Sequence, residues 1–312
     1  MTASFDTASG ESLARPLAAP LARTRPFYWS VRRELWENRA IYLAPLIAAG
    51  VVLLGVALGH LHLLHVQTRT QADFHGFERS GTQFGMPAIV SYLIGAGPIV
   101  VTTLIVGVFY CLAALNAERR DRSVLFWKSL PVSDLTTVLS KAVVPTIILP
   151  VVAMCVIVAA HLVMLVLDLA SAAAGGQDVG ALLGQLPLGH VWLDLGYLLL
   201  VIGLWYAPVW GWLLLVSAWS KRMTFLWGVG PPLAICVIER MGLGTDYAWN
   251  ALKSRLFGGL ADAFARPPAN TVTLPWPDPL SFLATPGLWI GLVVGAACLA
   301  GAVWLRRRRE PV

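Results

Sequence analysis

The sequence predicts an all-α, polytopic membrane protein with six transmembrane helices. Of its 312 residues, 57% are hydrophobic and only 13% are charged, whereas about a quarter of the residues in a soluble protein are charged. Apolar runs recur between short polar stretches, and each has the roughly 20 residues that a helix needs to cross a bilayer. These observations exclude a soluble enzyme or a nucleic-acid-binding protein as the first interpretation, in spite of an isoelectric point of about 9.4.

The N-terminal segment predicts two elements ahead of the first span. Residues 1–25 are rich in Ala, Thr, Ser, Arg and Pro and contain no apolar signal-peptide core, so we expect a disordered cytoplasmic arm. Residues 26–39 predict an amphipathic helix that lies in the membrane interface. Its apolar side chains recur at helical spacing: Phe27, Tyr28, Val31, Leu35 and Trp36. A membrane-anchoring collar and a lever packed against a partner subunit are both open roles for this helix.

Six segments are apolar and long enough to span a membrane, within one membrane domain over 26–305. They are 41–64, 87–114, 138–167, 191–219, 223–238 and 287–305. At 1.5 Å per residue the first is roughly 36 Å long, which crosses the hydrocarbon core with some tilt. The fifth is short and contains Pro231 and Pro232, which remove two backbone donors. We expect this proline pair to kink or break the helix unless neighbouring groups satisfy the freed carbonyls.

The basic residues predict the orientation of the spans. Seventeen of the 23 Lys and Arg residues fall in the N-terminal segment, the second connection together with Lys141 at the start of the third span, the fourth connection and the C-terminal tail, whereas the third connection, 168–190, contains none. Under the positive-inside rule, both termini of this multi-pass cell-membrane protein are cytoplasmic. The basic tail, 306–312, begins with four arginines, each of which adds about 1 kcal/mol of attraction to anionic lipid.

The connection 116–137 between the second and third spans predicts a short helix. Asp121 or Ser123 can cap its start, and Pro131 ends it, because the residue before a proline is forced out of the helical region. Ser133 offers a second cap, from which the third span begins. The short helix has several apolar side chains and is too short to be stable alone. It therefore needs a partner surface, or its aromatic residues lie in the lipid headgroup region.

This connection resembles a known family. Glu-Arg-Arg-Asp-Arg-Ser at 118–123, followed by Ser-Leu-Pro-Val-Ser at 129–133 between the second and third of six spans, is similar to the first cytoplasmic loop of permeases of the type-2 ABC transporter class. The resemblance implies that the loop forms a coupling helix that docks on a separate ATPase subunit, and that 26–39 is the family's elbow helix. It assigns the coupling contact to five residues: Arg122, Ser123, Phe126, Trp127 and Lys128.

The resemblance also implies the partners. The chain contains no G-x-x-x-x-G-K-[ST] sequence, so we expect it to hold no cofactor and to be no enzyme, with ATP and Mg²⁺ bound by a partner ATPase. Two ATPase subunits and a second permease copy or paralogue would complete a bacterial inner-membrane complex. Export of an amphipathic, lipid-like or peptide substrate is the expected activity. A non-transporting scaffold or sensor subunit is the alternative, and a secondary transporter is a weaker one.

Two further segments bear on transport. In the connection 239–286, apolar residues recur at three- and four-residue steps, which predicts an outer amphipathic helix followed by a proline-rich extended segment. These residues are Trp249, Leu252, Leu256, Leu260 and Phe264. In the fourth span, Trp205, Trp210 and Trp212 lie around Pro208 and form a candidate wall of the substrate path, although interface or lipid-facing packing also explains them.

The histidines near the end of the first span do not predict a metal site. His60 and His62 lie about 200° apart on a helix, and only His62 and His65 share a face. No cysteine lies close by in the sequence to complete a ligand set. We expect these histidines to be polar residues of the membrane interface.

Overall fold

The computed structural model describes residues 25–70, 85–120, 133–176, 178–258, 264–265, 276–277 and 279–308. This part of the chain is helical apart from one antiparallel pair of two-residue strands, β1 (Phe264–Ala265) and β2 (Trp276–Pro277). Six helical segments in it are long and apolar enough to cross a membrane, which confirms the prediction of a multi-pass helical membrane protein. They are Ala40–Gly59, Val90–Glu118, Asp134–Ala174, Val179–Trp205, Thr224–Leu243 and Pro286–Arg308.

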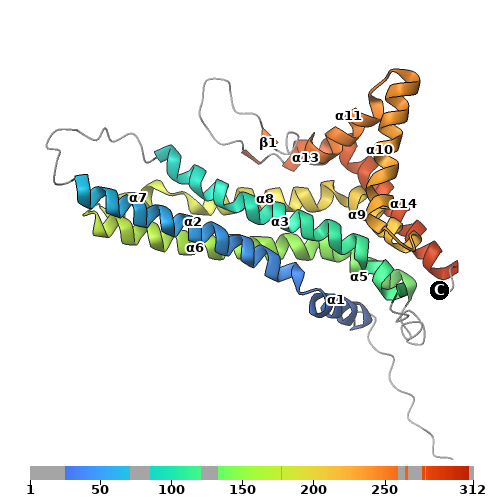
Figure 1. The fold of residues 1–312 in the computed structure, drawn as a ribbon, viewed down its shortest axis with the longest axis horizontal. Helices are drawn as coiled ribbons and strands as arrows, with labels where there is room; N and C mark the ends of the chain where they lie inside the picture. The colour runs from blue at the N-terminus through green and yellow to red at the C-terminus, as the bar shows by residue number, and fades with distance from the viewer. Residues whose placement is uncertain are drawn as a thin grey trace, which may run out of the picture.

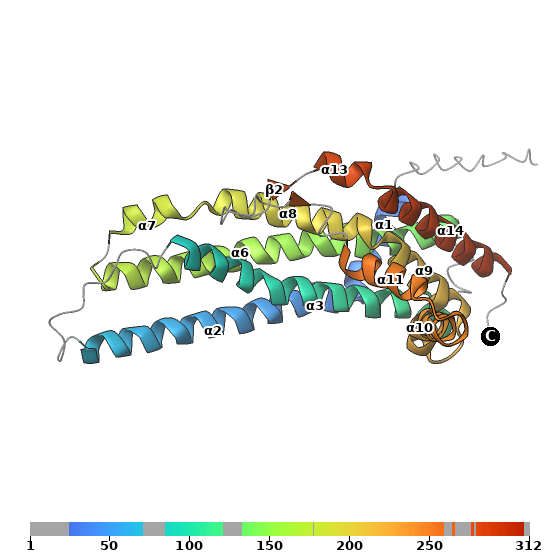
Figure 2. The ribbon, with the colours of Figure 1, turned by 90° about the horizontal axis from the view of Figure 1, so that it is seen from above.

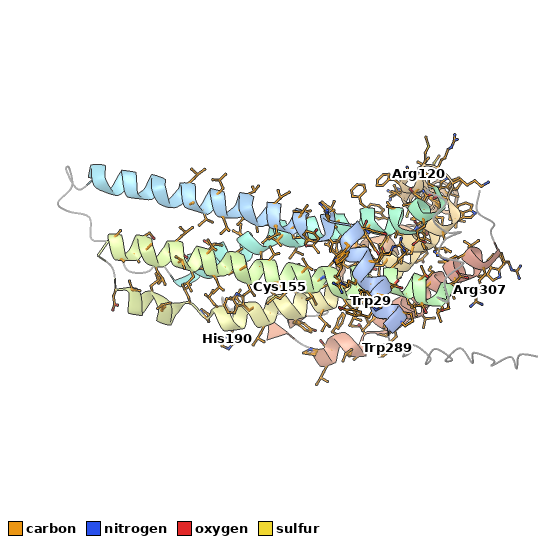
Figure 3. The ribbon with its side chains drawn as sticks, turned by 90° about the horizontal axis from the view of Figure 1, so that it is seen from below. Trp29, Arg120, Cys155, His190, Trp289 and Arg307 are labelled. Carbon is orange, nitrogen blue, oxygen red and sulfur yellow. The ribbon has the colours of Figure 1, made fainter. Side chains whose placement is uncertain are left out.

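The first three helices are a short helix, α1, and two long helices that run side by side. Helix α1 (Arg25–Glu37) is followed after a short turn by α2 (Ala40–Thr70), and α3 (Gly85–Arg120) returns beside α2. Figure 1 shows α2, α3, α6 and α8 running along the long axis of the molecule. Helix α1 lies across this direction near the end where α5 also lies (Figure 3). A helix thus covers the segment that the sequence predicted to be helical before the first span.

The third span is longer than predicted at both ends, and a cap explains its earlier start. Helices α5 (Asp134–Val143) and α6 (Leu149–Ala174) continue through a π-helical turn, η1 (Val144–Ile148), which gives 41 uninterrupted residues and a length of roughly 60 Å. The side-chain oxygen of Ser133 accepts a hydrogen bond from the backbone N–H of Thr136 at 3.1 Å and so caps α5. Pro145 and Pro150 lack backbone donors at η1, where the wider π turn accommodates the missing hydrogen bonds.

The prediction of one fourth span over 191–219 is wrong. Helix α7 (Val179–Gln185) leads into α8 (Leu188–Trp205), which ends at Tyr206, and a separate helix, α9 (Ala207–Trp219), begins there. Pro208 lies in the first turn of α9, where its missing N–H is tolerated, whereas inside a continuous helix it would remove a hydrogen bond. With 13 residues, α9 is roughly 20 Å long and too short to cross a bilayer alone.

The last two spans differ in how they pack. Helix α10 (Thr224–Leu243) is unbroken in spite of Pro231 and Pro232. It stands crosswise to the four long helices (Figures 1 and 2), and Gly228 is its one buried residue. Helix α14 (Pro286–Arg308) packs closely against α9, where Gly211 and Gly295 bring the two backbones together.

The connection between α10 and α14 is only partly helical. It contains α11 (Tyr247–Lys253), a π-helical turn η2 (Ser254–Gly258), the strand pair and α13 (Pro279–Ala284). The predicted amphipathic helix is wrong at Phe264, which pairs with Pro277 in the strand pair, and Leu260 lies outside the described residues. Two consecutive glycines at 258–259 lower the helix propensity before Phe264.

The buried core is divided along the long helices. One cluster joins α2, α3, α6 and α8 through residues such as Ala96, Ile99, Ala153, Ile157 and Leu195. A second cluster joins α3, α5, α9 and α14 at the end that α1 crosses, through residues such as Leu115, Val138, Leu214 and Ala302. The outward surfaces of the spans expose large apolar side chains, as a lipid environment requires.

Candidate functional site

Five charged side chains meet where α1, α3, α5 and α14 converge. We call Glu34, Glu118, Asp134, Lys141 and Arg306 the ion cluster. The Lys141 Nζ atom lies 2.7 Å from Glu34 Oε1 and 3.1 Å from Glu118 Oε1. Arg306 continues the chain of contacts, with Nη1 at 2.7 Å from Glu118 Oε2 and Nε at 2.9 Å from Asp134 Oδ1. Three carboxylates thus share two cations, and four helices are joined through their side chains.

The ion cluster is buried, which makes the pairing obligatory. Glu34, Glu118 and Lys141 are 3%, 6% and 2% exposed. The Tyr110 hydroxyl donates a hydrogen bond of 2.8 Å to the second oxygen of the Glu34 carboxylate. Because a buried charge is expensive without a partner, each member depends on the others. Ionisable side chains enclosed by membrane helices mark functional positions by default.

The ion cluster holds both ends of the segment 121–132. Glu118 lies just before this segment on the last turn of α3, and Asp134 is the first residue of α5 after it. Arg306 binds both carboxylates, so the last turn of α14 links the two ends. The segment itself lies outside the described residues, as do the predicted coupling positions Arg122, Ser123, Phe126, Trp127 and Lys128. Arg306, predicted to attract lipid as part of the basic tail, instead pairs inside the protein.

Ser217 on α9 forms hydrogen bonds with the backbone of α3 in the turn that precedes Glu118. Its hydroxyl is fully buried, donates to the carbonyl oxygen of Leu112 at 2.8 Å, and accepts the backbone N–H groups of Leu115 at 3.1 Å and Asn116 at 3.0 Å. This one side chain therefore bonds to three backbone groups of a neighbouring helix. The contact fixes the position of Glu118 along the axis of α3 relative to α9.

Replacing Ser217 with alanine is expected to lower the free energy of unfolding by about 1–3 kcal/mol, because it leaves buried backbone groups of α3 without their partner. Thermal unfolding of the purified protein in detergent measures this loss. Ser254→Ala is the control, since the exposed Ser254 hydroxyl bonds only locally to Ala251, and we expect it to change stability by less than about 0.5 kcal/mol. Equal melting temperatures for the two variants would contradict the role assigned to Ser217.

The predicted elbow residues divide between two sides of α1. Phe27, Val31 and Leu35 are half-buried, whereas Trp36 is exposed. The buried side is centred on Glu34, which the sequence analysis did not identify because a carboxylate among apolar residues does not fit an apolar stripe. Glu34 could have been identified from its spacing, because it follows Phe27 and Val31 at steps of four and three residues and so shares their side of the helix.

The three tryptophans of the candidate substrate path do not line one cavity. The Trp212 indole N–H donates to the carbonyl oxygen of Gly228 on α10 at 2.9 Å. The Trp205 ring lies 4.4 Å from the Arg255 guanidinium carbon and its N–H donates to the Arg255 carbonyl oxygen at 2.8 Å. Burial lowers the pKa of the Arg255 guanidinium, whose Nη1 atom donates to the Gly287 carbonyl oxygen at 3.0 Å.

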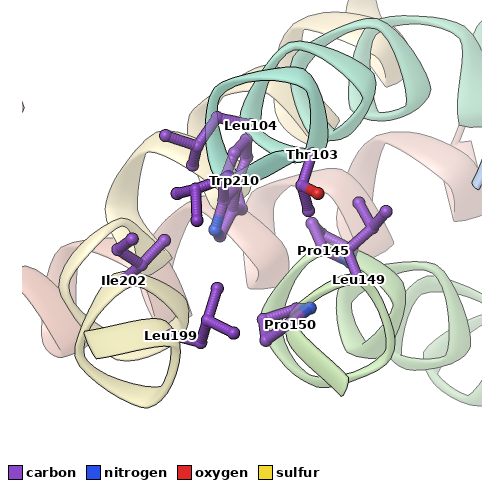
Figure 4. A pocket seen from close by; sticks show the side chains of 9 residues that line it. Thr103, Leu104, Pro145, Leu149, Pro150, Leu199, Ile202 and Trp210 are labelled. Atoms are coloured by element: carbon purple, nitrogen blue, oxygen red, sulfur yellow. The ribbon is translucent and has the colours of Figure 1, made fainter. Parts of the chain in front are cut away.

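Trp210 lines a small cavity between α3, α6, α8 and α9 (Figure 4). The enclosed space is about 10 Å³, which is room for one water molecule, and its lining is apolar except for Thr103 and the Trp210 indole. The buried indole N–H finds no acceptor among the described residues and points between the lining side chains. Pro145 and Pro150 form the wall at η1. Of the three predicted residues, Trp210 alone lines this cavity.

A second buried polar group escaped the sequence analysis. His161 is fully buried in α6, accepts the Trp192 indole N–H at Nδ1 at 3.2 Å, and donates from Nε2 to the Tyr92 carbonyl oxygen at 3.0 Å. The Tyr92 hydroxyl donates to Asp168 Oδ2 at 2.7 Å. Since both ring nitrogens of His161 are satisfied, this group fastens α3, α6 and α8 together. No local pattern in the sequence marks it.

Metal ligands do not gather in the part of the chain that the structure describes. Within those residues, no group of three or more His, Cys, Asp or Glu side chains is arranged to hold a metal ion. The side chains of His60, His62 and His65 lie outside the described part.

Comparison with known proteins adds no assignment to these sites. The chain matches no model of a protein family, no curated protein and no solved structure.

Proposed function

We propose that this chain is the permease subunit of a type-2 ABC transporter, in which it couples ATP hydrolysis by separate ATPase subunits to transport across the cell membrane. The observation that carries the proposal is the ion cluster, in which Arg306 binds Glu118 and Asp134 on either side of the segment that resembles the family's coupling loop. The six candidate spans and the crosswise helix α1 before the first of them agree with this function.

The ion cluster suggests how movement would pass from an ATPase into the membrane. Two ATPase subunits, which bind ATP and Mg²⁺, would dock on the cytoplasmic segments 121–132 of two permease chains. Glu118 and Asp134 flank that segment, and their contacts with Lys141 and Arg306 make α1, α5 and α14 follow it as one unit. The π-helical turn at η1 is the point where the third span can bend, since such turns weaken the regular hydrogen-bond ladder.

Transport would run between two permease copies or paralogues, because six helices enclose only half of a path. Export of an amphipathic, lipid-like or peptide substrate is the proposed activity, and its direction is taken from the resemblance to the family. The Trp210 cavity, with its one indole donor that has no partner among the described residues, has a volume of about 10 Å³ and is too small to hold such a substrate. The small size of that cavity favours, as a second candidate, a non-transporting scaffold or sensor subunit that recruits a cytoplasmic protein.

Replacing Phe126 and Trp127 together with alanine tests the coupling role. Loss of two aromatic anchors from an interface costs about 2 kcal/mol or more, so we expect a co-expressed partner ATPase to lose its permease-dependent stimulation and transport to stop. The double variant Tyr42→Ala/Phe109→Ala is the control, because it removes two exposed aromatic side chains from α2 and α3, outside the segments assigned a role in coupling or transport. Unchanged ATP hydrolysis and transport in the first variant would refute the proposal, and binding of the ATPase without any effect on its turnover would favour the scaffold.

A further inference from the structure

The outward side of α1 carries an arginine between two tryptophans. Trp29, Arg32 and Trp36 are spaced by three and four residues, so they form one stripe along the helix. The Arg32 guanidinium carbon lies 5.1 Å from the Trp29 ring centroid and 4.9 Å from that of Trp36. Both indoles are exposed, by 57% and 70%. Figure 3 labels Trp29 on this helix, near the end of the bundle.

The ion cluster fixes the direction in which this stripe faces. Glu34 on the opposite side of α1 is bound by Lys141 at 2.7 Å and by Tyr110 at 2.8 Å. Because these contacts are buried, α1 cannot rotate about its axis to hide the indoles without exposing or unpairing a charge. The two tryptophans therefore remain on the outer surface of the protein.

Arg32 is held in position without using its hydrogen-bond donors. Within the described residues Arg32 has no hydrogen bond and no ion pair, whereas its neighbour Arg33 binds Glu37. Stacking on indole faces leaves the N–H groups at the edge of the planar guanidinium directed away from the rings. Two parallel N–H groups of this kind match two oxygens of a phosphate group. The site therefore has a preorganised donor set that lacks an acceptor.

The position of α1 along the molecule points to lipid as the source of that acceptor. The first candidate span begins at Ala40, three residues after α1 ends, so α1 lies where the apolar part of the chain stops. A second stack, Arg308 over the exposed Trp304 at 4.4 Å, lies in the last turns of α14, next to Arg306 of the same ion cluster. Tryptophan concentrates at the level of the lipid headgroups, and two exposed Arg–Trp stacks at one end of the bundle mark that level.

We propose that Trp29, Arg32 and Trp36 form a binding site for the phosphate of an anionic phospholipid. The guanidinium edge binds two phosphate oxygens, and the two indoles cover the glycerol and ester region of the same lipid molecule. An anionic headgroup is favoured over a zwitterionic one, because the choline cation of phosphatidylcholine offsets the attraction of the phosphate to Arg32. The site attaches α1 to the membrane surface and does not depend on the identity of any ATPase partner.

Binding of phosphatidylglycerol to the full-length protein in detergent tests this site, with native mass spectrometry and the lipid-induced shift in melting temperature as readouts. We expect Arg32→Gln to weaken binding about fivefold, which corresponds to the roughly 1 kcal/mol that one arginine contributes at an anionic surface. Arg32→Lys keeps the positive charge but lacks the two parallel N–H groups of the guanidinium, so its loss of lipid affinity should be intermediate. Arg240→Gln removes an exposed arginine that pairs with Asp246 on the connection between α10 and α14, and should bind as the wild type does.

Three further measurements keep the test decisive. Without added lipid, Arg32→Gln should melt close to the wild-type temperature, because among the described residues the Arg32 side chain contacts only the exposed Trp29 and Trp36 indoles of its own helix; a large fall in melting temperature would overturn the assignment to an outward-facing site. Inorganic phosphate should produce no shift, and a phosphate-induced shift that Arg32→Gln abolishes would overturn lipid as the ligand. Equal binding of phosphatidylglycerol and phosphatidylcholine, or wild-type binding by Arg32→Gln, would also overturn the proposal.

Discussion

Replacing Lys141 with methionine is expected to lower the free energy of unfolding by about 3–5 kcal/mol, the usual effect of removing one partner of a buried ion pair. Lys141 is 2% exposed and lies within 3.1 Å of carboxylate oxygens of both Glu34 and Glu118. Without it, two negative charges remain enclosed beside each other. Helix α1 is held to the bundle by the Glu34 contact, so it should detach first.

Melting temperature in detergent and protease cleavage between α1 and α2 measure the effect of Lys141→Met. The control is Arg33→Met, which breaks the exposed pair with Glu37 and should cost less than about 1 kcal/mol. Adding Glu34→Gln to Lys141→Met removes the carboxylate that has lost its cation and should restore part of the stability, whereas Glu118 keeps its contact with Arg306. Equal melting temperatures for Lys141→Met and Arg33→Met would contradict the structural role of the ion cluster.

Replacing Gly211 with alanine is expected to separate α9 from α14. The added methyl group would lie 2.7 Å from the carbonyl oxygen and 3.1 Å from the Cα atom of Gly295. Both atoms belong to the backbone, so no side-chain rotation relieves the contact and the helices must move apart. Overpacking of this kind costs about 1–3 kcal/mol. Close backbone approach through small residues is a main source of helix association in membranes, so the loss affects the packing directly.

The matched control for Gly211→Ala is Gly50→Ala in α2. Both positions are glycines within helices, but no atom of a neighbouring element lies within 4 Å of a methyl group placed at position 50. There, alanine should be neutral or stabilise the protein by about 0.5–1 kcal/mol, because glycine is the poorer helix former. Melting temperatures that fall to the same extent in both variants would show that the contact with Gly295 is not the cause.

The coarse fold was predictable because length and hydropathy alone define a membrane span. Each of the six segments that the sequence marks as apolar overlaps one of the six candidate spans in the structure, although 191–219 does so only in its first half. The position of the break at Tyr206 was missed, although Pro208 was visible, because a proline inside an apolar run either kinks a helix or starts a new one. The choice depends on what the next turn packs against, here α14.

The polar sites were harder to predict because their members are far apart in the sequence. Glu34 and Lys141 are separated by 107 positions, and Glu118 and Arg306 by 188. Each of these residues taken alone looks like an ordinary interface charge. Their shared burial arises only when four helices meet, so no local pattern could show that Arg306 faces its partners inside the protein and that Arg308 stacks on an exposed tryptophan instead.

The sequence by itself determined that this chain is a multi-pass helical membrane protein, since the bilayer imposes the length and polarity of every span. The tertiary structure alone decided which side of each helix faces the protein. In lipid, both environments of a helix surface are apolar, so hydrophobicity does not distinguish a buried side from a lipid-facing one. For that reason Trp205, Trp210 and Trp212 looked equivalent in the sequence, whereas the fold gives them three different surroundings.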